Sequence, residues 1–155
     1  MKDKKGFTLI ELLVVVAIIA VLAAISVVAL NNARARARDS KRLADIKQIQ
    51  TALELYYLDQ DGYPDEPADD KIEGKCLDEN GFEATCSGTV YMAQVPDAPD
   101  PCDCSSGCPA SGDTYTYAAT GSSPYTSYTL KYCLGANSGG IAAGVRTATP
   151  AGISD

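Results

Sequence analysis

Glu11 is the residue whose chemistry stands out, because it is a carboxylate at the start of a long apolar run. Leu12–Leu30 contains nineteen residues, and Ser26 is the only polar one. A helix of this length crosses a hydrocarbon core of ~30 Å. A charged carboxylate in such a span costs about 2.5–3.5 kcal/mol when it is central and less toward the interface. Glu11 therefore needs either a partner or access to the lipid headgroups.

Gly6 lies before the apolar run, where a cut would leave the helix on the mature protein. A secretory signal instead has a shorter apolar centre, with its small-residue cleavage site after it. A cut after Gly6 would free the α-amine of Phe7, four residues before Glu11 and on the same helix face. We predict that this amine pairs with Glu11, within a subunit or between neighbours. The alternative is a carboxylate that only reaches out to the headgroups.

The residues around this position resemble a known family. The segment Lys4-Lys5-Gly6-Phe7-Thr8-Leu9-Ile10-Glu11-Leu12-Leu13-Val14-Val15 is similar to the class III signal and N-terminal helix of type IV pilins and type II secretion pseudopilins. The resemblance is strong over residues 1 to about 63 and loose beyond. It implies cleavage between Gly6 and Phe7 by a prepilin peptidase, N-methylation of Phe7, and a role for Phe7 and Glu11 in docking subunits into a filament.

Six cysteines, all after residue 75, predict a small domain stapled by disulfides in an oxidising compartment. Only nine residues separate the first two, so we expect a local disulfide between them. Pairing among the other four stays open. Zinc or copper held by three clustered thiolates, with the last cysteine as a fourth ligand, is a weaker alternative, because the spacing is not a paired CxxC motif. The first two are Cys76 and Cys86; the others are Cys102, Cys104, Cys108 and Cys133.

Four aspartates near the cysteine cluster, Asp97, Asp100, Asp103 and Asp113, could supply oxygens to a calcium ion. The resemblance also suggests calcium, since a loop of some major pseudopilins binds it, but the residue pattern of that loop is not recognisable here. We therefore predict no cofactor and no metal site, with calcium as the alternative.

Charge is divided unevenly along the chain. Residues 1–42 carry eight basic and three acidic side chains, whereas residues 43–155 carry five basic and seventeen acidic ones. The acidic C-terminal part argues against binding of phosphates or nucleic acid. The chain has no histidine, no Gly-rich phosphate loop and no nucleophile motif, so we predict that it is not an enzyme.

A basic cluster follows the apolar run, and it bears on orientation. We expect these side chains to meet lipid phosphates, or else acidic residues of neighbouring filament subunits. The cysteines favour a head outside the cytoplasm, but a count of Lys and Arg on each side of the span favours the opposite. We follow the cysteines and the family signal. The cluster is Arg34, Arg36, Arg38, Lys41 and Arg42.

The predicted fold class is α+β. A helix should run from Phe7 to Gln60, with an apolar stripe at spacings of three and four in its second half and an end at Gly62 and Pro64. Strands are expected over 114–120, 127–134 and 141–149, with a loose tail after the last one, and residues 65–87 should form a loop with a short strand near Phe82. We expect the helix, half transmembrane and half amphipathic, to pack on an antiparallel sheet of three or four strands. The stripe is Leu43, Ile46, Ile49, Gln50, Leu53, Tyr56 and Tyr57.

These features predict a cleaved leader (1–6), a transmembrane or filament-core helix (7–30), its amphipathic continuation (31–61) and a globular β head (62–155). We expect a structural subunit of a type IV pilus-like filament, with a major or minor pseudopilin of a secretion system as the alternative and a membrane-tethered metal-binding module as a remote one. Expected partners are copies of itself, a prepilin peptidase, an inner-membrane assembly platform and, before assembly, membrane lipid. The predicted location is a single pass through the cytoplasmic membrane with the N-terminus in the cytoplasm and the head outside, and then a periplasmic or extracellular filament.

Overall fold

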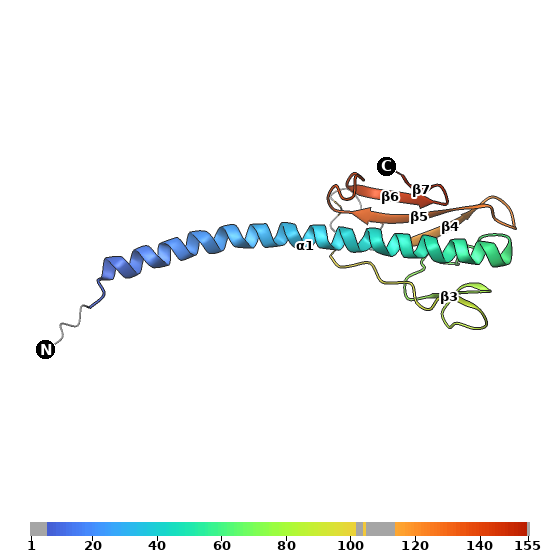
Figure 1. Ribbon diagram of the computed structural model, residues 1–155, viewed down its shortest axis with the longest axis horizontal. Coiled ribbons are helices and arrows are strands. Elements are labelled where there is room, and N and C mark those ends of the chain that lie inside the picture. Colours follow the sequence, from blue (N-terminus) through green and yellow to red (C-terminus); the bar gives the residue numbers. More distant parts are fainter. Residues whose placement is uncertain (1–5, 102–103, 105–113, 155) are drawn as a thin grey trace. The chain divides into compact units, whose positions relative to one another are not determined.

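The computed structural model describes residues 6–101, 104 and 114–154 (Figure 1). The chain divides into two compact units, residues 1–34 and residues 35–155. We call the first the N-terminal unit and the second the head unit, and describe each by itself.

The helix α1 (Leu9–Gln60) has 52 residues and begins two residues later than predicted. No glycine or proline interrupts it, because the chain has neither residue between Phe7 and Asp61. At its C-terminal end, Asp61 adopts a positive φ of 54° and donates its backbone N–H to the Tyr57 carbonyl at 2.9 Å. Gly62 follows, and this left-handed turn ends the helix.

A four-stranded antiparallel sheet carries most of the predicted strands. Its order is β4 (Thr116–Thr120), β5 (Ser127–Leu134), β6 (Gly144–Thr149) and β7 (Gly152–Ser154). The strand β7 was not predicted: we expected a loose tail there, which is wrong. Residues 152–154 pair with β6 through the tight turn that follows Thr149, and such a short strand exists only because a neighbour supplies its hydrogen bonds.

A second, three-stranded antiparallel sheet lies in the region predicted to be mostly loop. Its order is β2 (Gly81–Glu83), β1 (Cys76–Asp78) and β3 (Val90–Met92). The strand near Phe82 is present, whereas β1 and the second sheet were missed. Three-residue strands are too short to show an alternating pattern. The fold class is confirmed: a long helix packed on small antiparallel sheets, with two disulfides in the described part of the chain.

One core joins the helix to both sheets of the head unit. From α1, Ile46, Ile49 and Leu53 are fully buried, as the apolar stripe predicts. Tyr128 and Leu130 alternate inward along β5 to meet them, and Figure 1 shows β4 and β5 beside this half of the helix. The tyrosines of these strands are packing residues, with ring centroids 4.7 to 5.9 Å apart in successive contacts.

Candidate functional site

Thr8 and Glu11 form a capping box at the start of α1. The Glu11 carboxylate accepts hydrogen bonds from the Thr8 backbone N–H at 2.8 Å and from the Thr8 hydroxyl at 2.7 Å. In return, the Glu11 backbone N–H donates to the Thr8 hydroxyl oxygen at 3.3 Å. This reciprocal pattern satisfies donors that the first turn of a helix leaves without intrahelical partners. In the uncut chain, the Glu11 carboxylate therefore has a partner that the sequence analysis did not consider.

Apolar side chains lie on every face of α1 between residues 9 and 30. Phe7 is 83% exposed, and the large apolar residues of Leu9–Leu30 are between 47% and 81% exposed. By length and composition, α1 could span a membrane, with a mean hydropathy of 3.2 over its most apolar eighteen residues. The one polar side chain in Leu12–Leu30, Ser26, donates its hydroxyl to the Leu22 carbonyl at 2.8 Å. This surface therefore contains no unsatisfied hydroxyl that would oppose burial in lipid or protein.

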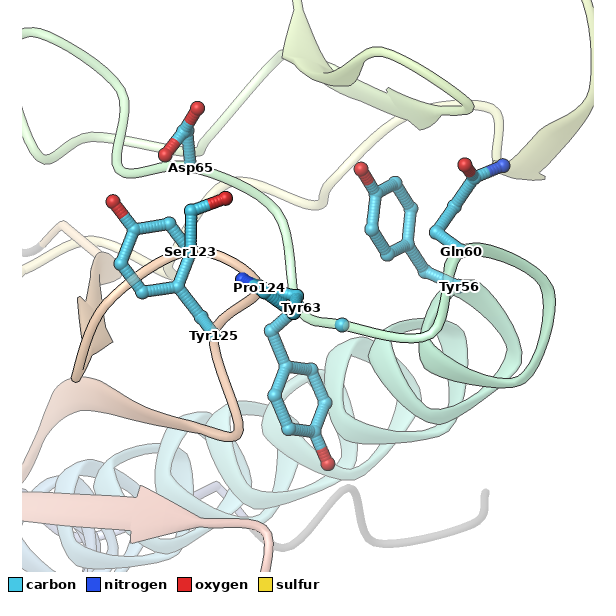
Figure 2. Close-up of a pocket in the computed structure, with 8 residues that line it drawn as sticks. Tyr56, Gln60, Tyr63, Asp65, Ser123, Pro124 and Tyr125 are labelled. Atoms are coloured by element: carbon cyan, nitrogen blue, oxygen red, sulfur yellow. The ribbon is translucent and has the colours of Figure 1, made fainter.

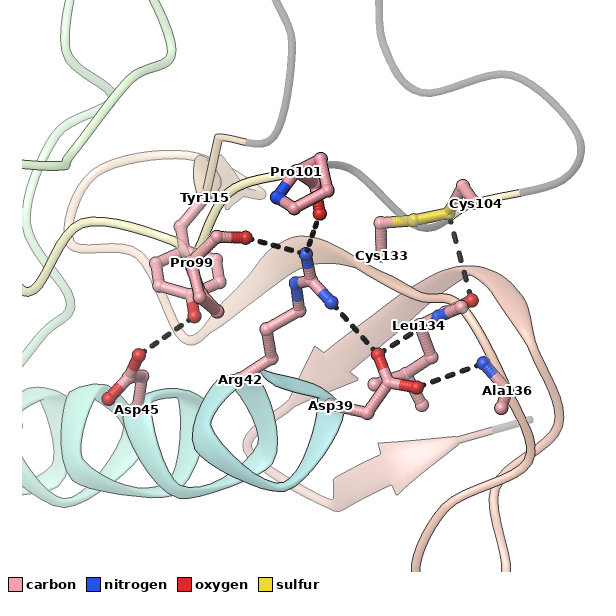
Figure 3. Close-up of polar contacts among 11 residues, drawn as sticks. Asp39, Arg42, Asp45, Pro99, Pro101, Cys104, Tyr115, Cys133, Leu134 and Ala136 are labelled. Atoms are coloured by element: carbon pink, nitrogen blue, oxygen red, sulfur yellow. Dashed lines mark hydrogen bonds and ion pairs between the residues drawn. A yellow bond between two sulfur atoms is a disulfide. The ribbon is translucent and has the colours of Figure 1, made fainter. Parts of the chain in front are cut away.

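Arg42 does not belong with the other cations of the basic cluster, and its assignment to lipid is wrong. The side chain is fully buried in the head unit and forms an ion pair of 2.9 Å with Asp39. It also donates to the carbonyls of Pro99 at 2.7 Å and Pro101 at 3.0 Å (Figure 3). Lys41 donates to the Asp97 carbonyl at 3.3 Å. The exposed arginines of the cluster are Arg34 and Arg36.

Asp39 completes this network from the other side. Its two carboxylate oxygens accept the backbone N–H groups of Gly135 and Ala136, each at 2.9 Å. One buried ion pair on α1 thus holds both the 99–101 segment and the turn after β5 (Figure 3). Sequence reasoning missed it because a charged pair three residues apart on a helix is usually solvated. The sequence does contain an indication of this burial, because the spacing places Asp39 and Arg42 on the same helix face as the apolar residues Ile46 and Ile49.

Asp45 makes a second buried polar contact between helix and sheet. The Tyr115 hydroxyl donates to its carboxylate at 2.9 Å. Burial raises the pKa of Asp45, and the hydrogen bond from Tyr115 opposes that rise. Burial and the Asp45 carboxylate together raise the pKa of Tyr115. This contact fixes the position of the residue just before β4.

Two disulfides close the head unit in the described part of the chain. Cys76 bonds to Cys86, the pair expected from their spacing, and Cys104 bonds to Cys133. The latter pairing removes two of the four thiolates of the alternative metal site. Cys102 and Cys108 lie outside the described residues.

The calcium candidates are only partly described. Asp97 and Asp100 are exposed, and Asp103 and Asp113 lie outside the described residues. Among residues 6–101, 104 and 114–154, no group of three or more His, Cys, Asp or Glu side chains is placed to hold a metal ion.

Comparison with known proteins points to the N-terminal region. Residues 1–27 match the prokaryotic N-terminal methylation motif. The chain is 39% identical over 64 residues to the type II secretion system core protein G of Vibrio cholerae, covering 41% of this chain and 44% of that protein. It is 40% identical over 63 residues to the type IV wide pilus major component PilA4 of Thermus thermophilus, covering 41% and 48%.

A third relative, the type IV major fimbrial protein FimA of Dichelobacter nodosus, is 48% identical over 56 residues, covering 36% of each chain. No solved structure matches. The matched region spans less than half the length of these curated relatives. The chain thus carries a prepilin N-terminal methylation motif, and its N-terminal region is distantly homologous to type II secretion core protein G and to type IV pilins.

Proposed function

We propose that this chain is a structural, non-enzymatic subunit of a type IV pilus-like filament, polymerising through the apolar segment 7–30 after removal of residues 1–6. The observation that carries the proposal is the apolar surface on every face of residues 9–30, in a segment of which residues 1–27 match the methylation motif. A helix that is apolar on every face is stable only inside lipid or protein. The membrane covers it first, and neighbouring subunits cover it in the filament.

Packing rather than the hydrophobic effect must drive the transfer from lipid to filament. Lipid tails are as apolar as leucine side chains, so moving the helix between them gains little from desolvation. A charge pair between subunits then sets the axial register of the subunit that is being added. After cleavage by a prepilin peptidase, the Phe7 amine of one subunit can pair with Glu11 of its neighbour, in a surrounding of low dielectric where the attraction is strong. Glu11 would then exchange its Thr8 hydrogen bonds for an intersubunit ion pair.

The head is proposed to lie outside the cytoplasm, with the N-terminus inside. The two disulfides support this orientation, because disulfides persist in oxidising compartments. The opposing count of Lys and Arg loses weight, since long segments after a span are translocated largely regardless of charge. The inner-membrane assembly platform and the prepilin peptidase remain the proposed partners.

Substitution of Glu11 tests the docking role. We expect Glu11→Ala to insert and be cleaved normally while the yield of sheared filaments falls at least about tenfold, equivalent to roughly 1.4 kcal/mol of lost subunit affinity. Glu83→Ala is the matched control, because Glu83 is an exposed carboxylate of the head unit. Normal filaments from Glu11→Ala would refute the docking role. Mass spectrometry of the mature N-terminus should find methylated Phe7.

A pseudopilin of a type II secretion system is the second candidate, favoured by the identity to protein G over the N-terminal region. The two roles differ in where the filament ends. Electron microscopy of a strain lacking this chain would show loss of surface filaments in the first case. In the second case, surface filaments would persist and secreted enzymes would accumulate in the periplasm.

A further inference from the structure

The two ends of α1 are held by different means. At the C-terminal end, the Tyr63 N–H donates to the Tyr125 carbonyl at 2.8 Å, and a small cavity beside Asp65 lies between the helix end and the loop that joins β4 to β5 (Figure 2). Gly62 allows this approach, because a Cβ atom there would lie 2.9 Å from the Cβ of Pro124. A segment distant in sequence therefore helps to fix the place where the helix ends.

At the N-terminal end, the residues of the first turn fix the place where the helix begins. Thr8 is the N-cap: its carbonyl accepts the Leu12 N–H at 3.3 Å, and its hydroxyl oxygen accepts the Glu11 N–H at 3.3 Å. Residues 6–8 lie outside the helix. A Cβ atom on Gly6 would meet nothing within 4 Å, and Phe7 is 83% exposed. The peptide bond between these two residues is therefore accessible and non-helical.

Without this cap, the helix has a reason to extend toward its N-terminus. The first N–H groups of a helix have no intrahelical acceptor, and in hydrocarbon no water takes the place of one. If Thr8 offered no side-chain oxygen, the Ile10 and Glu11 N–H groups would find acceptors in the carbonyls four residues earlier. Those carbonyls belong to Gly6 and Phe7. Their use would draw the peptide bond between these two residues into the first turn of the helix.

The conformation of this bond matters for its hydrolysis. A water oxygen adds to the Gly6 carbonyl carbon, the C–N bond to Phe7 breaks, and the products are a Gly6 carboxylate and a Phe7 ammonium group. In an extended helix, the Gly6 carbonyl would be bonded to the Ile10 N–H, so a peptidase would cut only the fraction of chains in which that turn is open. Asp3 is of a type that caps helices and could cap such an extension, whereas Gly6 opposes it as a poor helix former. The Thr8 cap therefore acts in a competition between two helix starts.

We propose that Thr8 is a positioning residue for removal of the leader: as the N-cap of α1, it keeps the Gly6–Phe7 bond out of the helix and available to the peptidase. This inference rests on the proposed function, because it takes the cut after Gly6 as given. The Thr8 oxygen caps the backbone N–H of residue 11, which is present whatever the side chain there. Thr8 therefore acts before the cut, and the Glu11 carboxylate acts in docking after it.

The test is the rate at which a prepilin peptidase cuts the full-length chain in membrane vesicles. Thr8→Val keeps the shape of the side chain and removes the cap, and we expect the cut to slow about fivefold, the factor by which loss of a typical N-cap shifts a two-state equilibrium. Thr8→Ser and Thr8→Asn keep a capping oxygen, and their rates should stay within about twofold of the unmodified chain. Thr51→Val is the matched control, because the Thr51 hydroxyl donates within the head half of α1, to the Lys47 carbonyl at 2.9 Å.

Carbon chemical shifts of Gly6 and Phe7 in micelles report the conformation of the bond directly. They should move toward helical values in Thr8→Val and stay non-helical in Thr8→Asn. Cutting of Thr8→Val at the unmodified rate would overturn the inference, as would slow cutting without a helical shift. Slow cutting of Thr8→Asn would also overturn it, because the peptidase would then recognise the threonine side chain itself. Absence of any cut after Gly6 in the unmodified chain would instead overturn the proposed processing, and this inference with it.

Discussion

The two halves of α1 use apolar residues in opposite ways. In the N-terminal unit, the large apolar residues of the helix are exposed on all faces, from Leu9 to Leu30. In the head unit, the same helix is polar on one side and buries the other, where Ile46, Ile49 and Leu53 are inaccessible to solvent. The difference teaches that one helix can serve two surroundings: its second half is stabilised by the fold of its own chain, and its first half depends on molecules outside that chain.

Polar groups follow the same division. Within residues 8–30 of the N-terminal unit, the polar side chains make local contacts, since Thr8 pairs with Glu11 and Ser26 bonds to its own helix. The head unit uses them across long sequence distances, as Asp39 does with residues 135 and 136. Local pairs leave a helix free to change its surroundings, whereas long-range ones lock a helix to its sheet.

The largest expected effect comes from breaking the buried network. Asp39→Ala should lower the free energy of unfolding of the head by about 3–5 kcal/mol, because it leaves the Arg42 charge buried without this partner. Urea unfolding followed by tyrosine fluorescence checks this, since all nine tyrosines lie between residues 56 and 132 and report on the head alone. Asp97→Ala, at an exposed position, is the control and should change stability by less than about 0.5 kcal/mol. A loss as small as the control's would show that the network does not hold the head together.

The second prediction contrasts the two halves of the helix directly. Leu53→Ala should destabilise the head by about 2–5 kcal/mol through loss of buried area and a residual cavity. Ile18→Ala removes similar apolar volume from a residue that is 53% exposed, and we expect no change in head unfolding. Ile18→Ala should instead lower the yield of filaments, while the stability of its head stays normal. If Ile18→Ala destabilised the head, the two halves would not be independent.

The smallest expected effect is a dependence of the stability of the head on acid. Asp78 is buried, and hydrogen bonds from the Ser87 and Asn80 backbone N–H groups lower its pKa in the folded chain. The charged form therefore contributes stability above the ordinary value of 3.8, and this contribution is lost as pH falls through the lowered pKa. Asp78→Asn should cost about 1–3 kcal/mol at neutral pH, and its deficit relative to the unmodified chain should shrink below about pH 4.

Urea midpoints between pH 2 and 7 measure this dependence, with Asp59→Asn at the exposed helix end as the control. A deficit that stayed constant down to pH 2 would contradict the assignment of the acid sensitivity to Asp78.

Much of the fold could be predicted from local pattern. The helix, its apolar stripe and the strands at 116–120, 127–134 and 144–149 were expected within a few residues, because each has a periodicity long enough to be read. The strands β1 and β7 have three residues each, which is too few for any period. Each is stabilised by hydrogen bonds to neighbouring strands, β7 by β6 and β1 by β2 and β3, which its own three residues do not reveal.

The candidate site was predictable in part for the same reason. The motif from Lys4 to Val15 lies in one continuous segment, so its residue types could be recognised without a structure. The cavity beside Asp65 could not, because it joins residues near 60 to residues near 124, which only the fold brings together.

The sequence by itself determined the methylation motif, the apolar run, the single carboxylate at its start and the separation of an acidic, cysteine-containing part. These properties are carried by residues close together in the chain. Only the tertiary structure decided that Arg42 leaves the basic cluster for a buried ion pair, and that Asp65 borders a cavity. Burial depends on which distant segments cover a side chain, and charge alone does not specify that. The charge of Arg42 would assign this side chain to lipid phosphates, but in the fold it is enclosed by the Asp39 carboxylate and two backbone carbonyls.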